Sequence, residues 1–256
     1  MRLTYQTRRT VNNTTRRSRS PRGSGELLAE EIIDAATQLL LDAQDAAAVS
    51  IRAVATKVGV TPPSIYLHFA DKEALLDAVC ARYFEQLDAR LRAAVDGVDD
   101  PLERALRMGI AYVRFGVATP VLYRQAFHAL PVDEQSKVDQ VLAASAFVRF
   151  TEVITEVARA GLFPEDEVGT IVLELWSAAH GVASLMIAKP ALWRSGDFTL
   201  AEEVLRSICI GRAVLGVGRG REPSGLPALL DSLRVASAAA IGQEKVKSEL
   251  ERVHPR

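Results

Sequence analysis

Cysteine, histidine and aromatic residues are scarce in this sequence. Its 256 residues include two cysteines, four histidines and only 6% aromatic residues. Cys80 and Cys209 stand far apart in helical patterns, which favours reduced thiols over a disulfide or a metal framework. A GxSxG nucleophile elbow, an HExxH motif and paired cysteine ligands are also missing. These absences argue against an enzyme, and we expect no catalytic residue, no metal and no cofactor.

Long apolar runs are absent as well. Glu174 and His180 interrupt the best candidate, so we expect no segment able to cross a bilayer. The Arg16-Arg17 pair is not followed by an apolar stretch, which argues against an export signal. With 48% hydrophobic and 25% charged residues, the composition is that of a soluble globular protein. We therefore expect a cytoplasmic protein with no membrane partner.

Residues 1–25 contain seven arginines and no acidic side chain. The rest of the chain then carries 24 basic against 32 acidic residues, a net charge of −8, although the whole chain stands at −1. The segment also lacks the apolar pattern needed to fold. Two interpretations stay open. It is either a flexible basic arm that adds phosphate or minor-groove contacts to DNA, or a solvated tail that follows from a misplaced start.

The most informative stretch runs from Ser50 to Leu76. Its first part has apolar residues at helical spacing after Ser50, a candidate N-cap. That helix is expected to end at Gly59, because a chain that turns sharply out of a helix favours positive φ. The pattern predicts a first short helix followed by a tight turn.

A second short helix follows the turn. We expect Thr61 to cap it, and Pro62 and Pro63 fall in its first turn, where a missing N–H costs little. Ile65 and Phe69 face inward at this spacing. Two short helices around a glycine turn form a helix-turn-helix, which lays its second helix in the major groove of DNA.

The string VGVTPPSIYLHFADKEALL resembles the DNA-binding signature of the TetR family of bacterial transcriptional regulators. The matching pieces are the Gly59-Val60 turn, Tyr66-x-His68-Phe69, and Lys72-Glu73 followed by Leu75-Leu76. The resemblance implies an all-α fold, in which an N-terminal three-helix helix-turn-helix domain precedes a C-terminal helical bundle for ligand binding and dimerisation.

The resemblance also implies which residues meet DNA. Polar side chains reach base edges, apolar ones touch thymine methyl groups, and the remainder bind phosphates. Many relatives place a polar base-reading residue where this chain has proline, so fewer hydrogen-bonding readers are expected. The expected DNA-binding residues are Thr61 and Ser64 (base edges), Pro62, Pro63 and Leu67 (thymine methyl groups), and Tyr66, His68, Lys72, Ser50 and Arg52 (phosphates).

Every other periodic segment reads as a helix. We expect four regions: a basic arm (1–25), the helix-turn-helix domain (26–71), the bundle (72–218) and a C-terminal extension (219–256) with an amphipathic helix near 226–233 and a break at Gly242. Glycines 216, 218 and 220 read as a hinge, and Thr199-x-x-Glu202 as a capping box. The expected helices are 26–41, 72–95 (capped by Asp71), 101–118, 120–127, 134–159, 164–188 and 199–217.

A local motif, Trp176-x-x-x-His180-Gly181, resembles a pattern of one TetR C-terminal subfamily. One helical turn apart, Trp176 and His180 share a face, either at a ligand cavity or dimer seam or in an ordinary core. Small residues on helices 164–188 and 199–217 make that pair our candidate interface for a homodimer. A hydrophobic effector would suit an apolar cavity. The candidate pocket residues, which could equally be plain core, are Met108, Tyr112, Phe115, Tyr123, Phe127, Phe147, Phe150, Trp176 and His180.

These observations lead to one functional hypothesis and two alternatives. The sequence predicts a repressor that binds a palindromic operator on double-stranded DNA as a homodimer and is released by a small effector. In the family, the effector tilts the helix that begins at Lys72. The alternatives are an activator of the same family and a helical ligand-binding protein that does not bind DNA.

Overall fold

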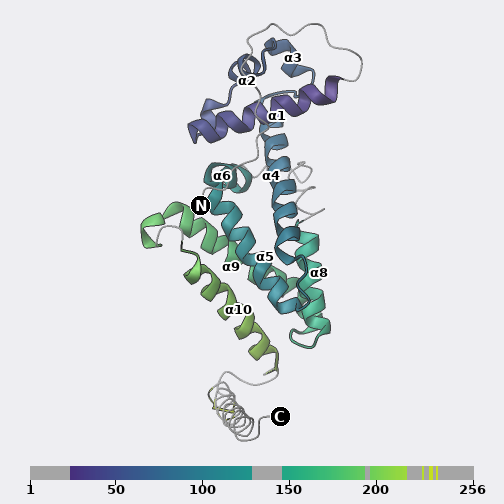
Figure 1. Ribbon diagram of the computed structural model, residues 1–256, viewed down its shortest axis with the longest axis vertical. Coiled ribbons are helices and arrows are strands. Elements are labelled where there is room, and N and C mark those ends of the chain that lie inside the picture. Colours follow the sequence, from purple (N-terminus) through teal and green to yellow (C-terminus); the bar gives the residue numbers. More distant parts are fainter. Residues whose placement is uncertain are drawn as a thin grey trace, which may run out of the picture. The chain divides into compact units, whose positions relative to one another are not determined.

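The computed structural model describes residues 24–128, 146–193 and 197–217, together with positions 227, 231, 232 and 235. Within these ranges every regular element is a helix and no strand occurs (Figure 1). The all-α prediction is therefore confirmed. Contacts divide the chain between Cys209 and Ile210. The larger unit holds everything described up to Cys209, and the described part of the smaller unit is helical throughout.

The first three helices form a small unit with its own core. They are α1 (Ser24–Ala43), α2 (Ile51–Val58) and α3 (Pro62–Tyr66), with a 3₁₀ turn, η1 (Ala46–Ala48), ahead of α2. One apolar side chain from each helix is fully buried, since Ile32, Val54 and Ile65 all have no exposed surface. A unit of this size is marginal alone, and α1 also packs against two helices of the bundle, α4 (Lys72–Val95) and α6 (Pro120–His128).

The bundle is organised around α5 (Pro101–Ala118). This helix packs against α4, α8 (Ala146–Arg159) and α9 (Val168–Ala188). A 3₁₀ turn, η2 (Glu165–Glu167), leads into α9, another, η3 (Pro190–Leu192), follows it, and α10 (Thr199–Val217) comes last. Large side chains from several helices fill the core, namely Tyr83, Phe84, Met108, Ile154 and Ile171.

Two predicted helix caps differ from the structure, and α9 begins at Val168 instead of the predicted residue 164. Thr61 stands at the N-cap position of α3, but its side chain caps no backbone N–H. The Thr199-x-x-Glu202 capping box is also wrong: α10 begins at Thr199 itself, whose N–H donates to the Asp197 carboxylate (2.8 Å). The Glu202 carboxylate accepts instead from Arg114 of α5 (3.0 Å).

Several predictions lie wholly or partly outside the described residues. These are the arm up to residue 23, the stretch 134–145 of the predicted helix 134–159, the hinge glycines 218 and 220, and Gly242. Of the predicted helix near 226–233, only residues 227, 231 and 232 are described, and all three are helical. The boundary expected between residues 71 and 72 stays a prediction.

One helix of the described chain is long and apolar enough, by length and composition, to cross a membrane. It covers Glu165–Ala188, so the expectation that no segment qualifies is wrong by this criterion. Its apolar character has a source within the bundle, because Ile171, Leu175 and Val182 are buried on the side that meets the neighbouring helices. Leu173 and Leu185, by contrast, are about half exposed.

Candidate functional site

The turn between α2 and α3 is set by its caps. The Ser50 hydroxyl oxygen accepts the N–H of Ala53 (3.1 Å) and so begins α2. Gly59 ends the helix with φ +80°, in the left-handed region that glycine adopts without a steric penalty, and its N–H donates to Ala55 O (2.9 Å). Both features agree with the sequence prediction.

Helix α3 presents an apolar and a polar side. Ile65 is fully buried and Phe69, just after the helix, is 9% exposed, so these two residues anchor α3 to the small unit. On the other side Tyr66 is 55% exposed and Leu67 84%. The Thr61 and Ser64 hydroxyl oxygens lie 3.1 Å apart, at hydrogen-bonding distance. The exposed surface of α3 therefore combines an aromatic ring, a leucine and a pair of linked hydroxyls.

Three predicted phosphate-binding residues have different surroundings. Arg52 is exposed on α2. The half-buried His68 ring lies beside Phe69, with 6.5 Å between ring centroids, and near Gly25 of α1. The Lys72 ammonium donates to Ala46 O (2.9 Å) and ties the start of α4 to η1. An ammonium has three hydrogens, so this contact is compatible with a phosphate contact.

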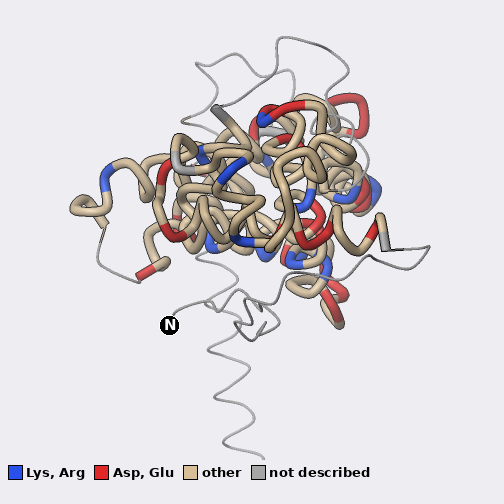
Figure 2. Tube along the Cα trace, turned by 90° about the horizontal axis from the view of Figure 1, so that it is seen from above, with Lys and Arg blue, Asp and Glu red and all other residues tan. Residues whose placement is uncertain are grey.

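The small unit is acidic overall. Residues 24–71 contain two basic residues, Arg52 and Lys57, and seven acidic ones. Basic and acidic positions are intermixed over the described chain (Figure 2). Several of the carboxylates are engaged: Asp42 pairs with Lys57 (3.3 Å), and Asp45 and Asp71 cap η1 and α4. Two more, Glu30 and Asp34, belong to a contact with the bundle.

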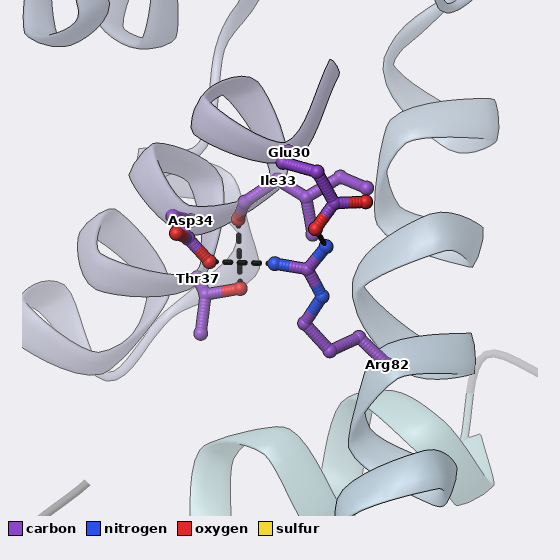
Figure 3. A network of polar contacts seen from close by, with 5 residues as sticks. All are labelled: Glu30, Ile33, Asp34, Thr37 and Arg82. Atoms are coloured by element: carbon purple, nitrogen blue, oxygen red, sulfur yellow. Dashed lines mark hydrogen bonds and ion pairs between the residues drawn. The ribbon is translucent and has the colours of Figure 1, made fainter. Parts of the chain in front are cut away.

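That contact is a fork made by Arg82 of α4. Its guanidinium donates to the Asp34 carboxylate (2.6 Å) and to the Glu30 carboxylate, one turn apart on α1 (Figure 3). Beside them the Thr37 hydroxyl donates to Ile33 O (2.8 Å) within α1. Arg82 therefore joins the small unit to the long helix that enters the bundle. Sequence reasoning missed this contact, because it joins residues about fifty positions apart.

A pocket lies between α4, α5, α8 and α9. Its cavity volume is about 40 Å³, and the space free of atoms in and around it, open solvent at its mouth included, is about 470 Å³. Five of the nine predicted pocket residues line it, and the aliphatic part of the lining was not predicted. The i, i+4 spacing of Leu87 and Leu91 indicates one face of a helix. It does not distinguish a face that packs in the core from one that lines a pocket. The lining residues are Leu87, Leu91, Met108, Gly109, Tyr112, Ala146, Phe147, Phe150, Leu175, Trp176 and Ala179.

The structure places the other four predicted pocket residues outside this lining. Phe115 packs on Tyr83, with ring centroids 4.9 Å apart. Phe127 lies against Tyr123 (4.8 Å) and His180 (4.8 Å), in an aromatic cluster next to the pocket wall. The cluster joins α6 to α9. Trp176 belongs to both groups, because it lines the pocket and its ring lies 5.6 Å from that of His180.

Hydrogen bonds connect this cluster to the pocket wall. The Tyr112 and Tyr123 hydroxyl oxygens lie 3.0 and 2.8 Å from His180 Nδ1. Tyr123 also reaches His180 O and Ser184 Oγ, both at 3.3 Å. Burial, then the neighbouring Tyr123, raises the pKa of Tyr112 well above its usual value, and burial raises the pKa of Tyr123. Both hydroxyls are therefore protonated at neutral pH.

Two family profiles match the chain and together cover more than half of it. The profile described as bacterial regulatory proteins, tetR family, matches residues 32–79, and that of the tetracyclin repressor-like C-terminal domain matches residues 105–208. The chain belongs to the TetR family. Members of this family are bacterial regulatory proteins. The first profile covers the α2–α3 turn, and the second covers the Trp176 to His180 segment.

Curated relatives of this TetR-family chain match only in part. The transcriptional repressor KstR2 of Mycobacterium tuberculosis is 39% identical over 22% of this chain and 28% of its own length. The transcriptional regulator EthR of Mycolicibacterium smegmatis is 33% identical over 38% of this chain and 44% of its own length. The nucleoid occlusion factor SlmA of Vibrio campbellii is 27% identical over 44% of this chain. This last alignment spans 58% of the relative, so the chain covers less than two thirds of the length of each.

Solved structures resemble this TetR-family chain along most of their own length. The fatty acid degradation regulator FadR of Bacillus halodurans has a TM-score of 0.58 at 19% identity, over 71% of this chain and 98% of that one. A putative transcriptional regulator of Pseudomonas aeruginosa PAO1 has a TM-score of 0.61 at 17% identity, over 78% and 97%. At these identities the likeness shows the fold alone.

Proposed function

We propose that this TetR-family protein is a cytoplasmic repressor that binds a palindromic operator as a homodimer and is released by a small hydrophobic effector. The observation that carries DNA binding is the surface of α3. Leu67 and Tyr66 are large and exposed, while Ile65 and Phe69 hold the helix in place from behind. A name that includes repressor, carried by the relative KstR2, supports repression over activation.

The chemistry of this surface suits a major groove. Leu67 and the two prolines offer apolar contact to thymine methyl groups, and the hydroxyls of Thr61 and Ser64 offer hydrogen bonds to base edges. The Tyr66 hydroxyl suits a phosphate oxygen. Because α3 has only five residues and begins with two prolines, little conformational entropy is lost when it docks.

Charge supports a role for the arginine-rich segment. DNA is a polyanion, and phosphate contacts by Lys and Arg supply most of its non-specific affinity. The small unit carries two basic and seven acidic residues over 24–71, so its own net charge opposes binding. Seven arginines in residues 1–25 would reverse the sign locally. We therefore propose that residues 1–25 act as a DNA-binding arm.

Exposed leucines on α9 and α10 support a homodimer through these helices. Leu173 and Leu185 of α9 and Leu200 of α10 are each half exposed, and a second copy would remove them from water at about 25 cal/mol per Å² of apolar surface. Two copies related by a twofold axis would present two α3 helices to successive major grooves, about 34–36 Å apart.

A single helix, α4, links the pocket to the DNA-facing unit. It begins at Lys72, contacts α1 through Arg82, and reaches the pocket at Leu87 and Leu91. At about 1.5 Å per residue, the pocket end lies roughly 25 Å along the helix from the Lys72 end. A ligand that favours one tilt of α4 would shift the equilibrium between two states that differ in the spacing of the α3 helices. The size of this shift is set by the difference in the ligand's affinity for the two states.

The test for DNA binding is selection of sites from random sequence by the purified full-length protein. Anisotropy titrations on the selected site would then compare Leu67→Ala with a matched control, Leu192→Ala, since both leucines are more than 70% exposed and neither change leaves a cavity. Leu67→Ala should weaken binding by about 1 kcal/mol or more, and Leu192→Ala should leave it unchanged. No enriched sequence at low salt, or equal affinities, would refute the proposal.

The dimer is tested by sedimentation at several concentrations. Leu173→Arg places a charge on the exposed face of α9 and should give a monomer, because an unpaired charge in an interface is costly. Leu192→Arg, the same change on η3, should leave the dimer intact. A monomeric wild type, or two variants that sediment alike, would contradict the proposed interface.

A further inference from the structure

The pocket wall contains only two side chains with a strong hydrogen-bonding group among its described lining residues, Tyr112 and Trp176. All other lining residues are aliphatic, aromatic without a polar atom, or methionine. The character of any ligand therefore depends on whether the Tyr112 hydroxyl and the Trp176 N–H are available to it.

The Tyr112 hydroxyl is already paired inside the wall, with Trp176 beside it. The Tyr112 hydroxyl lies 3.0 Å from His180 Nδ1 and 3.5 Å from the Tyr123 hydroxyl, and the neighbouring Trp176 side chain lowers the pKa of Tyr112 against the larger effect of burial. Because Tyr112 is protonated, its hydrogen points to an acceptor, and His180 Nδ1 is one when the imidazole proton is on Nε2. The Tyr112 oxygen can then accept from the neighbouring Trp176 N–H.

Tyr123 also lies within reach of His180 Nδ1, but it has other acceptors nearby. Tyr123 lies 2.8 Å from His180 Nδ1 and 3.3 Å from both His180 O and Ser184 Oγ. Two hydroxyl hydrogens thus face three acceptors, so neither hydrogen needs a ligand as its partner. Breaking into it would leave a buried polar group unpaired, which is costly.

The described lining of the pocket also carries no charged side chain. The described lining contains no ionisable group except the neutral Tyr112. Two carboxylates adjoin lining residues in the sequence: Glu174, before Leu175, is exposed, and Asp88 follows Leu87. Asp88 is buried and pairs with Arg149 (2.9 Å) and Arg92 (2.7 Å). An ionic ligand would find no partner on this wall, and an unpaired buried charge is strongly disfavoured.

We infer that the effector of this pocket is an uncharged hydrocarbon-like molecule with no hydrogen-bonding group against the α4–α5–α8–α9 wall. His180 is the positioning residue: it holds the Tyr112 hydroxyl in a hydrogen bond, so that this hydroxyl does not bind a polar ligand. This inference rests on the proposed function of the pocket as an effector site. It gives the Trp176-x-x-x-His180 motif a role in ligand selection.

The test uses three probes of matched shape, namely 4-tert-butyltoluene, 4-tert-butylphenol and 4-tert-butylbenzoate. Binding is followed by quenching of Trp176 fluorescence, excited at a wavelength where the probes absorb weakly, in a Trp193→Phe background of the full chain. The toluene should bind best. The phenol should bind about 10- to 100-fold more weakly, since its hydroxyl would be buried unpaired, and the benzoate should not bind measurably.

Three variants separate positioning from simple packing. His180→Leu removes the acceptor, frees the Tyr112 hydroxyl for a ligand and should cut the toluene-to-phenol ratio to about threefold. His180→Asn keeps an acceptor near the Nδ1 position and should retain the wild-type ratio. Tyr123→Phe removes the second hydroxyl but leaves Tyr112 paired, so it should also retain the ratio. Circular dichroism checks that each variant is folded.

The outcomes are distinguishable. Wild-type binding of the phenol as tightly as the toluene, or the same ratio in folded His180→Leu, overturns the inference while the effector site stands. If no probe quenches Trp176 up to its solubility limit, and none releases the selected DNA, the proposed effector site itself fails and the inference with it.

Discussion

Gly116 of α5 lies where a side chain would collide with the aromatic cluster. A Cβ at this position would stand 2.7 Å from Cδ2 and 2.9 Å from Cε2 of Tyr123, closer than real Cβ atoms approach other atoms. The ring has little room to move, because Tyr123 is 2% exposed and lies against Phe127 and His180. Gly116→Ala should therefore destabilise the fold by pushing α6 from α5 or expelling the ring.

The magnitude follows from three opposing contributions. Overpacking a well-filled core costs about 1–3 kcal/mol. Displacing the Tyr123 hydroxyl from its partners costs about 0.5–1.5 kcal/mol per hydrogen bond. Replacing glycine by alanine inside a helix returns about 1 kcal/mol. The net expectation is a loss of about 1–3 kcal/mol, or roughly 3–10 °C in Tm for a chain of this size.

The assay is urea and thermal unfolding followed by circular dichroism at one fixed protomer concentration, because dimerisation makes Tm concentration-dependent. Gly109→Ala is the matched control on the same helix. Its added Cβ would meet only the terminal Cδ1 of Leu205, at 3.2 Å, so its stability should stay within about 1 kcal/mol of wild type. The reasoning is refuted if Gly116→Ala is as stable as Gly109→Ala.

Two further predictions concern Arg82 and Cys80. Arg82→Ala should cost less than about 2 kcal/mol of stability, because its partners are largely exposed. It should nevertheless reduce the effect of a pocket ligand on DNA affinity, as measured by anisotropy with and without 4-tert-butyltoluene. An unchanged ligand effect would exclude Arg82 from the coupling between the pocket and DNA binding. Burial, then Asp77, raises the pKa of Cys80 from 9.0 to about 12, so the folded state holds this proton more tightly and stability falls as pH rises from about 9 to 12. In urea unfolding, wild type should lose about 1.4 kcal/mol per pH unit more than Cys80→Ala above pH 9, and equal slopes would contradict the raised pKa.

Local signals at the helix-turn-helix were readable from the sequence. Ser50, Gly59 and Asp71 act on backbone groups within a few residues of themselves, so the chain nearby contains what decides them. The prediction that Thr61 caps α3 was wrong, and the reason is also local. Pro62 and Pro63 have no N–H to cap, and the N–H of Ser64 donates to Thr61 O (2.9 Å), so the threonine hydroxyl turns to that of Ser64.

The remaining differences come from contacts between distant segments. Glu202 was expected to cap its own helix, but Arg114, 88 positions earlier, pairs with it. Phe115 and Tyr112 look alike in sequence, and only the rotation of α5 against α4 sends the first toward Tyr83 and the second toward the pocket. The aliphatic lining from Leu87 and Leu91 has the same periodicity as core. Which face borders a cavity is decided by four helices together.

The contact between Thr61 and Ser64 has a consequence for how operator preference can evolve. If α3 reads DNA as proposed, the two hydroxyls form one linked donor–acceptor unit, since their oxygens are 3.1 Å apart. Changing either residue also redirects the hydrogen of the other, so single substitutions would alter recognition at two base positions together. A new operator would then be reached more readily by paired changes at 61 and 64 than by two independent steps.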